Sequence, residues 1–305
     1  MKKRKIVIVG SLNMDIVVST DRLPRSGETL TGHSVHYIPG GKGANQAVCC
    51  AKLGADSTMI GLVGDDWFGT KVIDSLNANG VDTSYIQTLE SASTGVASIT
   101  HMKEDNTIIV VPGTNGMLTE AELQDLEQLI QEDDILLVQL EIPIQTVFTA
   151  LRMAKQIGAV TILNPAPYTT LSDELLELVD YITPNETEFE QMIGRTFSGE
   201  SSLEQAISDW QNQRSAMMIV TRGKHGCSYF LHEDVVTVTP PEVNVIDTVG
   251  AGDAFNGGLA YGLMSGWSIS HCIEFAIQVS AAAVTRFGAQ DGMPTQDEVL
   301  QIAVK

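Results

Sequence analysis

The chain has 305 residues, of which 43% are hydrophobic, and this length and composition suit one large α/β domain with a sizeable core. The formal net charge of −20 argues against nonspecific binding to nucleic acid or to an anionic membrane, and no apolar run is long enough to span a bilayer. The four cysteines lack metal or redox spacing, so we expect reduced thiols in a cytoplasmic protein.

Residues 6–10 form an apolar run that predicts a fully buried strand of a parallel sheet. Beyond it, helix and strand patterns alternate, which implies βαβ units. The elements expected in the first half are a helix at 44–53, a strand at 58–63, a helix at 68–77 and a strand at 85–88. Those expected in the second half are helices at 120–130, 144–157 and 173–178, strands at 135–139, 160–163, 181–183 and 216–221, an edge hairpin at 226–231 and 235–238, and closing helices at about 252–264 and 269–286.

Four other strand-like segments have no helices of their own. Short strands are expected at 16–18 and 34–38, and a hairpin at 95–101 and 107–111 turns around residues 103–106. We therefore expect a small sheet outside the main one. The chain is expected to form a single domain, residues 1–305, in which this discontinuous sheet takes residues from about 12–20, 34–39, 94–101 and 107–111.

Residues 245–258 are rich in glycine and lead into an apolar helix pattern. Small residues in front of a helix expose its first N–H groups, which together with the helix dipole bind phosphate. Asp253 stands beside this anion site, where a carboxylate would repel phosphate unless it takes a proton from the attacking group. An ordinary helix cap is an equal alternative for Asp253. The stretch is neither a dinucleotide fingerprint, because Phe255 stands where a third glycine is needed, nor a Walker loop.

Other polar residues follow predicted strands, where open α/β sheets bind their ligands. Asn13 and Asp15 offer amide donors and a carboxylate acceptor to neighbouring sugar hydroxyls, or else form a polar loop. Residues 40–46 combine three glycines with Lys42 and Asn45. This combination suits the close approach of a ligand as well as a plain turn before a helix.

Three further strand ends carry candidate side chains. Glu141 directly follows an apolar strand. Asn185 and Glu188 either hold a hydrated Mg²⁺ or cap the helix that they open, and locally the cap is the better interpretation. Residues 221–226 fit contact with a nucleotide or the entry to a hairpin.

Two signatures and three shorter motifs stand in a fixed order along the chain. The signatures are residues 40–47 and 247–255, and the motifs at 139–141, 164–167 and 183–188 stand between them. Because of these motifs and their order, nearly the whole chain resembles the ribokinase-like carbohydrate kinases, also called the phosphofructokinase B family. The resemblance implies a three-layer α/β/α fold with a mostly parallel central sheet and a β-sheet lid over the sugar, which in relatives also pairs two subunits. It further implies ATP-dependent transfer of the γ-phosphoryl group to the 5-hydroxyl of D-ribose.

Several alternatives stay open beside that activity. Within the family, the substrate could instead be 2-deoxyribose, another sugar or a nucleoside. A sugar-binding relative without catalysis is less favoured, because Asp253, Gly250 and Gly252 are intact. A nicotinamide dehydrogenase is also less favoured, because neither glycine cluster completes the dinucleotide fingerprint.

The resemblance also implies roles for individual residues. Asp253 is the expected base, with Gly250, Ala251 and Gly252 as the anion hole. The residues implied to hold the sugar are Asn13, Asp15, Gly40, Gly41, Lys42, Asn45, Glu141 and Asp253. Those implied to face ATP are Asn185, Thr221, Gly223, Gly226 and Gly252, while Glu188 orients the Mg²⁺ shell. The implied ligands of a monovalent cation, usually K⁺, are Asp247, Val249, Ala283, Arg286, Gly288 and Gly292, mostly through backbone carbonyls. The chain departs from the family where relatives often carry Ser, at Gly292, and where a polar residue often lies near the adenine, at Ile277.

Overall fold

The computed structural model describes residues 4–102 and 106–303. Within these ranges, nine strands form the main sheet. Their spatial order is β13 (Asp234–Val238), β12 (Cys227–Leu231), β11 (Met217–Thr221), β10 (Tyr181–Ile182), β9 (Val160–Asn164), β8 (Ile135–Gln139), β1 (Ile6–Val9), β4 (Ser57–Gly64) and β5 (Asp82–Leu89). The strands from β11 to β5 are parallel, and β12 and β13 add the antiparallel edge hairpin that the sequence predicted.

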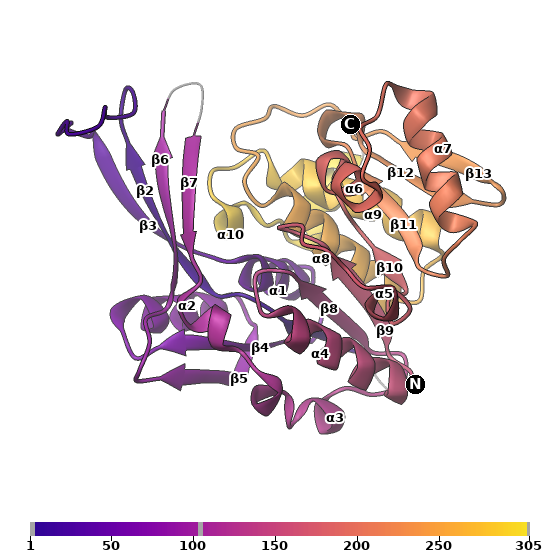
Figure 1. Cartoon of the computed structure of the whole chain (residues 1–305), viewed down its shortest axis with the longest axis horizontal. Helices are drawn as coiled ribbons and strands as arrows, with labels where there is room; N and C mark the ends of the chain where they lie inside the picture. The colour runs from indigo at the N-terminus through magenta and orange to yellow at the C-terminus, as the bar shows by residue number, and fades with distance from the viewer. Residues whose placement is uncertain (1–3, 103–105, 304–305) are drawn as a thin grey trace.

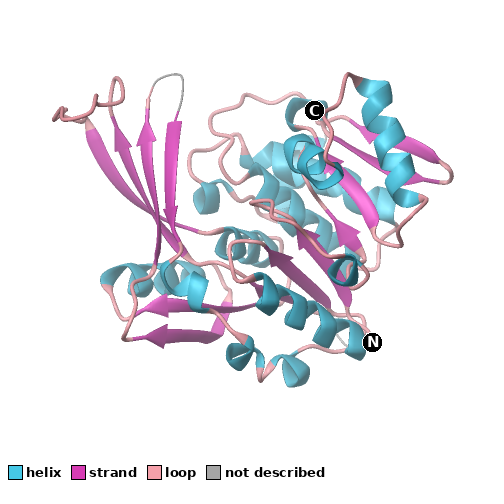
Figure 2. Ribbon diagram, in the orientation of Figure 1, coloured by secondary structure: helices cyan, strands magenta, loops and turns pink. Residues whose placement is uncertain are grey.

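Helices cover both faces of the main sheet (Figure 2). Side chains alternate along β1, so that Ile6 and Ile8 join one apolar cluster while Val7 and Val9 join the other. The first cluster is covered by α1 (Lys42–Lys52), α2 (Trp67–Ala78), α8 (Ala251–Met264), α9 (Ile269–Ala283) and α11 (Gln296–Ala303). The second is covered by α3 (Leu126–Leu129), α4 (Ile144–Ile157), α5 (Asp173–Leu176), α6 (Glu186–Ile193) and α7 (Glu200–Gln211). This arrangement confirms the predicted three-layer α/β/α fold.

A separate four-stranded sheet rises away from the main body (Figure 1). Its order is β3 (Ser34–Gly40), β2 (Asn13–Ser19), β6 (Gly95–His101) and β7 (Asn106–Val111). At its base Asn13 pairs with Gly40 on one side and Gly95 on the other. The small sheet is therefore anchored where β1 ends and β2 begins. Residues 103–105 of the predicted hairpin turn lie outside the described residues.

Three expectations about individual elements were wrong. The predicted helix at 120–130 is instead a 3₁₀ helix, Glu120–Leu123, followed by the short α3. A turn at residues 124 and 125 separates the two short helices, and both bury leucines in the same cluster, namely Leu123, Leu126 and Leu129. The predicted helix at 269–286 ends at Ala283, because the next carbonyl, that of Val284, accepts hydrogen bonds from residues 246 and 247. Asn13 and Asp15 lie within β2, not in a loop.

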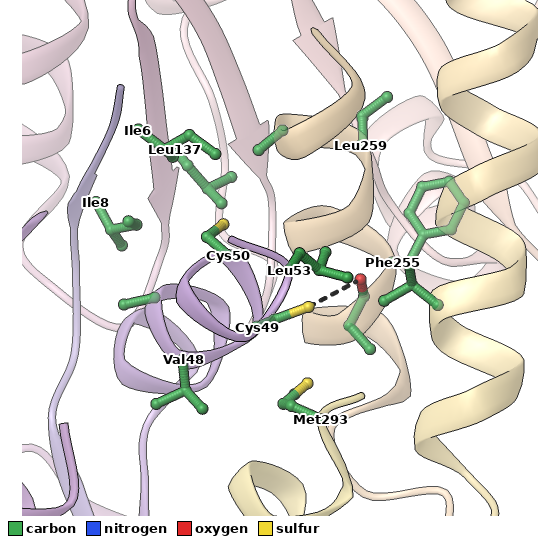
Figure 3. Packing of buried hydrophobic residues seen from close by; sticks show 14 of the residues in the cluster. Ile6, Ile8, Val48, Cys49, Cys50, Leu53, Leu137, Phe255, Leu259 and Met293 are labelled. Carbon is green, nitrogen blue, oxygen red and sulfur yellow. Dashed lines mark hydrogen bonds between the residues drawn. The ribbon is translucent and has the colours of Figure 1, made fainter. Parts of the chain in front are cut away.

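Helices α1 and α8 pack closely, and this contact brings their N-terminal ends together. A Cβ at Gly257 would lie 2.6 Å from the side chain of Cys49, so only glycine allows this approach. The Cys49 thiol donates to the carbonyl oxygen of Ala254 at 3.6 Å (Figure 3). No helix within residues 4–102 and 106–303 has the length and apolar character needed to cross a bilayer.

Candidate active site

The N-terminus of α8 leaves backbone N–H groups available for a ligand. Gly250 caps the helix with a φ of 81°, which glycine adopts without strain. The N–H of Ala251 donates to Thr248, whereas no acceptor among the described residues reaches the N–H of Gly252 or of Asp253. A Cβ at Gly252 would meet no atom within 4 Å, so open space lies beside these donors. The arrangement fits an anion-binding helix terminus.

Asp253 is buried in the first turn of this helix, with 6% of its surface exposed. The alternative of an ordinary cap is wrong, because Gly250 occupies the cap position and the cap makes no side-chain hydrogen bond. Asn45 Nδ2 donates to Asp253 Oδ2 and Gln46 Nε2 donates to Oδ1, each at 3.0 Å. Burial raises the pKa of Asp253, while the charge of Lys42 and the two amide hydrogen bonds oppose that rise. The site therefore contains a desolvated carboxyl group that is suited to accept a proton.

Lys42, the first residue of α1, is half-buried among carboxyl groups. Although burial works to lower the pKa of Lys42, the charges of Asp253, Glu141 and Glu188 raise it above its usual value. Burial, followed by the charges of Glu141 and Asp253, raises the pKa of Asp15 to about 7. The ligand-free site thus concentrates carboxyl groups around a lysine ammonium group.

The residues predicted to hold a sugar meet at the base of the small sheet. Asn13 Oδ1 accepts a hydrogen bond from Asn115 Nδ2 at 2.7 Å, and no acceptor in the described part of the chain reaches Asn13 Nδ2. Asn45 Oδ1 is buried and has no donor among the described residues. A free amide donor and an unpaired amide acceptor match the hydroxyl groups of a small sugar. Asn115, which fixes the orientation of Asn13, stands in no motif and could not be found from the sequence.

Glycines allow the backbone after β3 to approach the sugar-side carboxyl groups. A Cβ at Gly40 would lie 2.5 Å from the Asp15 carboxylate, and Gly41 has a φ of 92°. Glu141 Oε2 accepts the backbone N–H of Lys42 at 3.1 Å. The structure therefore brings Asp15, Gly40, Gly41, Lys42 and Glu141 together, as the sequence predicted for one site.

A cleft of about 760 Å³ opens beside the N-terminus of α8. The predicted residues that line it are Lys42, Asn185, Glu188, Thr221, Gly223, Gly226, Gly250, Ala251, Gly252 and Asp253. Part of the wall is apolar and is formed by Pro240, Val243, Ile277 and Val284, which suits the flat face of a base. The other residues predicted to hold the sugar lie outside this lining and adjoin the cleft through Lys42 and Asp253.

Asn185 and Glu188 form the reciprocal cap that the sequence favoured locally. The Asn185 side chain accepts the Glu188 N–H, and Glu188 Oε2 accepts the Asn185 N–H, each at 2.8 Å. Burial raises the pKa of Glu188. Both residues also line the cleft. The cap and a role toward a hydrated cation are therefore compatible, because the cap occupies only one carboxylate oxygen of Glu188.

Arg222 is a residue that the sequence did not indicate, but it anchors the loop between β11 and β12. Its side chain is 8% exposed and makes a bidentate ion pair with Glu200, with both distances at 2.6 Å. It also contacts Glu186 at 3.2 Å and Ser228 at 3.1 Å. The guanidinium group thus fixes the loop that contributes Thr221, Gly223 and Gly226 to the cleft. A lone arginine in a glycine turn carries no local signal for partners this far along the chain.

The residues predicted to bind a monovalent cation converge behind the anion site. Asp247 accepts the N–H of Val249 at 3.0 Å and the N–H of Gly288 at 2.9 Å. A Cβ at Gly292 would lie 3.0 Å from the carbonyl oxygen of Ala283 and 3.8 Å from that of Arg286. Backbone carbonyls and a carboxylate are suitable ligands for a hard cation, so the residues present fit such an ion. Their roles stay predictions.

Comparison with known proteins identifies the family. Residues 3–296 match the profile described as pfkB family carbohydrate kinase. The ribokinase of Bacillus subtilis (strain 168) is 38% identical over 299 residues, which cover 98% of this chain and 99% of that protein. The deoxyribokinase of Salmonella typhi is 31% identical over 295 residues, which cover 96% of each chain.

Solved structures agree with this result. The structure of Arabidopsis thaliana ribokinase complexed with ribose and ATP has a TM-score of 0.90 and 30% sequence identity, and the match covers 99% of both chains. The match to the family profile spans nearly the whole chain and includes the glycine cluster before α1 and the N-terminus of α8. The chain therefore belongs to the pfkB family of carbohydrate kinases.

Proposed function

We propose that the protein is a ribokinase, which transfers the γ-phosphoryl group of ATP to the 5-hydroxyl of D-ribose. The observation that carries this proposal is the position of Asp253. Its buried carboxyl group lies between the sugar-side residues and the cleft, directly beside the unpaired N–H groups of α8. Similarity to ribokinases over nearly full length supports ribose as the acceptor.

The mechanism follows from this geometry. The 5-hydroxyl oxygen forms a bond to the γ-phosphorus, the bond from that phosphorus to the bridging oxygen of ADP breaks, and the hydroxyl proton passes to Asp253. The N–H groups of Gly252 and Asp253 and the ammonium group of Lys42 neutralise charge on the transferring oxygens. Asn13, Asp15 and the Asn45 carbonyl oxygen hold the other sugar hydroxyls. Because the protein mainly positions groups and neutralises charge, small displacements of Asp253 are costly.

Magnesium is expected to arrive with the nucleotide. No group of three or more His, Cys, Asp or Glu side chains in residues 4–102 and 106–303 could hold a metal ion by itself. Mg²⁺ keeps several waters and shares phosphate oxygens, so Glu188 would contact it through water. When bound, the ion supplies further charge neutralisation at the phosphates.

The substrate is tested with a panel of sugars and nucleosides. Wild-type protein is incubated with ATP and each acceptor, and ADP formation and the phosphorylated product are measured. D-Ribose is expected to give the highest kcat/KM, with the phosphate at the 5-position. The similarity to a deoxyribokinase makes 2-deoxyribose the second candidate. Failure to form ADP with every sugar and nucleoside of the panel would overturn the proposal.

Potassium is expected to activate the enzyme by holding the loop before α8 in shape. Replacing K⁺ by Na⁺ or by a bulky organic cation at constant ionic strength should lower kcat/KM several-fold. Asp247→Ala should lower the activity in K⁺ and remove the difference between the salts, because Asp247 binds the N–H groups of Val249 and Gly288. Equal activity of the wild type in all three salts would contradict a functional cation site.

The small sheet is expected to pair two copies of the chain. Its outer strand β7 exposes Ile108, Ile109, Val110 and Val111, with Ile109 at 69%. Apolar side chains on an open edge strand need cover, and a second copy supplies it symmetrically. Ile109→Lys should convert a dimer into a monomer in sedimentation at micromolar concentration. Ile144→Lys, at an exposed isoleucine outside the small sheet, should leave the dimer intact, and a fully active wild-type monomer would refute the pairing.

Localisation in the cytoplasm belongs to the same proposal. All four cysteines are free and buried, as expected for thiols that stay reduced.

A further inference from the structure

A chain of buried amide side chains lies behind Asp253 and has no assigned role. Gln46 on α1 and Gln139 at the end of β8 have no exposed surface, and Asn164 at the end of β9 is buried as well. Burying so many amide groups is costly unless each has a partner. Their hydrogen bonds therefore indicate what the chain of amides is for.

The orientation of each amide follows from its neighbour. The carbonyl oxygen of Thr183 can only accept, so the nitrogen of Asn164 faces it, at 3.3 Å. Asn164 Oδ1 consequently faces Gln46 and accepts from Gln46 Nε2 at 3.2 Å. The same nitrogen donates its second hydrogen to Asp253 Oδ1 at 3.0 Å. Both hydrogens of the Gln46 amide are thereby committed.

Gln139 completes the arrangement from the other side. Its Nε2 donates to Gln46 Oε1, which turns the oxygen of Gln46 away from Asp253. Gln139 Oε1 is left without a donor among the described residues and lies where a Cβ at Gly10 would be only 2.0 Å away. Gln139 Oε1, the last group in this series of amides, is left unpaired at a cost in free energy, and in return Gln46 presents a donor to Asp253.

We propose that Gln46 is a positioning residue that holds the Asp253 carboxylate in place for proton transfer, and that Gln139 and Asn164 fix the orientation of its amide. The inference rests on the proposed kinase function. A flipped Gln46 would direct its oxygen at the carboxylate and repel it. A flip would break the hydrogen bonds to Asn164 and Gln139 as well as the one to Asp253, so the donating orientation persists.

Some charged groups around Asp253 lower its pKa and others raise it. Lys42 stabilises its ionised form, Glu141 disfavours it, and the charge of Asp253 in turn is felt by Asp15, Glu188 and Cys49. Burial raises the pKa of Asp253, and the bonds from Asn45 and Gln46 lower it. Removing the Gln46 bond should therefore leave the other groups in place and raise the pKa of Asp253 further.

The first experiment is the pH dependence of kcat for Gln46→Met, a variant of similar volume without donors. A hydrogen bond to a charged group is strong enough to move a pKa by about one unit. The acidic limb of the kcat profile should therefore move to higher pH by about one unit, so that kcat at a given pH on that limb falls about tenfold, while KM for the sugar stays unchanged. Gln139→Met should move the acidic limb in the same direction but by less. In this variant Gln46 still has an N–H donor for Asp253, but the hydrogen bond from Gln139 no longer fixes the orientation of the Gln46 amide.

Gln211→Met is the matched control. Gln211 is a half-buried glutamine at the end of α7, in the helix layer on the opposite face of the sheet, and its side chain also has an unpaired oxygen. The variant should leave the limb where it is in the wild type. A rise in KM for the sugar with an unmoved limb in Gln46→Met would overturn the proposal, since Gln46 would then contact substrate.

The second experiment measures thermal stability without substrate, so its result does not depend on the proposed function. With a raised folded-state pKa, Asp253 contributes stability that is fully present below its unfolded pKa and is lost as pH rises through its folded pKa. Gln46→Met raises that folded pKa, so the loss deepens at high pH. The fall in Tm relative to wild type should be larger at about pH 8 than at about pH 5.

An equal fall in Tm at both pH values would mean that Gln46 only fills space, and it would overturn the proposal. A wild type that phosphorylates no acceptor would defeat the kinase function alone, because the comparison of Tm values would still report on Asp253.

Discussion

Asp253→Asn is expected to lower kcat by roughly a hundred- to ten-thousandfold while sugar binding persists, because the variant keeps the shape and loses the proton acceptor. The Asp253→Asn variant is expected to fold. The oxygen of the introduced amide can still accept from Gln46, and the amide group has nearly the same size and shape as the carboxylate that it replaces. Steady-state kinetics with ribose and ATP measure kcat, and calorimetry measures the affinity for ribose.

Asp297→Asn supplies the control for this substitution. Asp297 is an exposed aspartate in the first turn of α11, so its variant should match the wild type in both measurements. If Asp253→Asn kept the wild-type kcat, Asp253 would not be the base, and its burial among amide donors would need another explanation.

Asp15 is expected to provide most of the preference for ribose over 2-deoxyribose. A site built to bind a hydroxyl rejects an analogue without it, because its own buried polar groups are left unpaired at roughly 1–3 kcal/mol each. Ribose should therefore exceed 2-deoxyribose by at least about tenfold in kcat/KM, since about 1.4 kcal/mol is a factor of ten. Asp15→Ala should raise KM for ribose and remove much of this preference.

The pH dependence of KM provides a second measure of the same residue. The pKa of Asp15 is about 7 in the ligand-free site, so its carboxyl group gains charge and acceptor strength as pH rises through that value. KM for ribose should fall over this interval in the wild type and stay flat in Asp15→Ala. Asp21→Ala, at an exposed position beyond β2, should behave as the wild type. A wild type that prefers 2-deoxyribose, or that phosphorylates nucleosides fastest, would contradict the ribokinase assignment but not the kinase chemistry.

The sequence predicted the elements with strong local signals. The apolar run at β1 and the alternation that follows it were sufficient for a parallel sheet with helices on both faces, and the four helix-free strands indicated a second sheet. Helix α7 was missed although Leu203, Ile207 and Trp210 follow helical spacing and are buried. The segment 120–130 was predicted wrongly because its residues favour a helix locally, whereas the structure interrupts it with a turn at residues 124 and 125.

Within the site, the glycine clusters and the acids after strands were predictable because their chemistry is local. The distant side chains that orient these site residues could not be predicted. Asn115 fixes Asn13 from 102 positions away, and Gln139 fixes Gln46 from 93 positions away. Such pairs depend on strand order and register, which no local pattern encodes.

The contact between α1 and α8 also governs when the site forms during folding. Asn45 and Gln46 reach Asp253 across 208 and 207 positions of the chain. The proton acceptor is therefore absent from a ribosome-bound chain until α8 has emerged, and Asn45 and Gln46 until then lack their shared partner. During the same interval α1 lacks the helix that covers its cysteine face. Contacts of such sequence separation form late and slowly. Nascent chains should accordingly remain inactive and expose the apolar face of α1, which makes the interval before α8 is synthesised the period of greatest exposure to chaperones and aggregation.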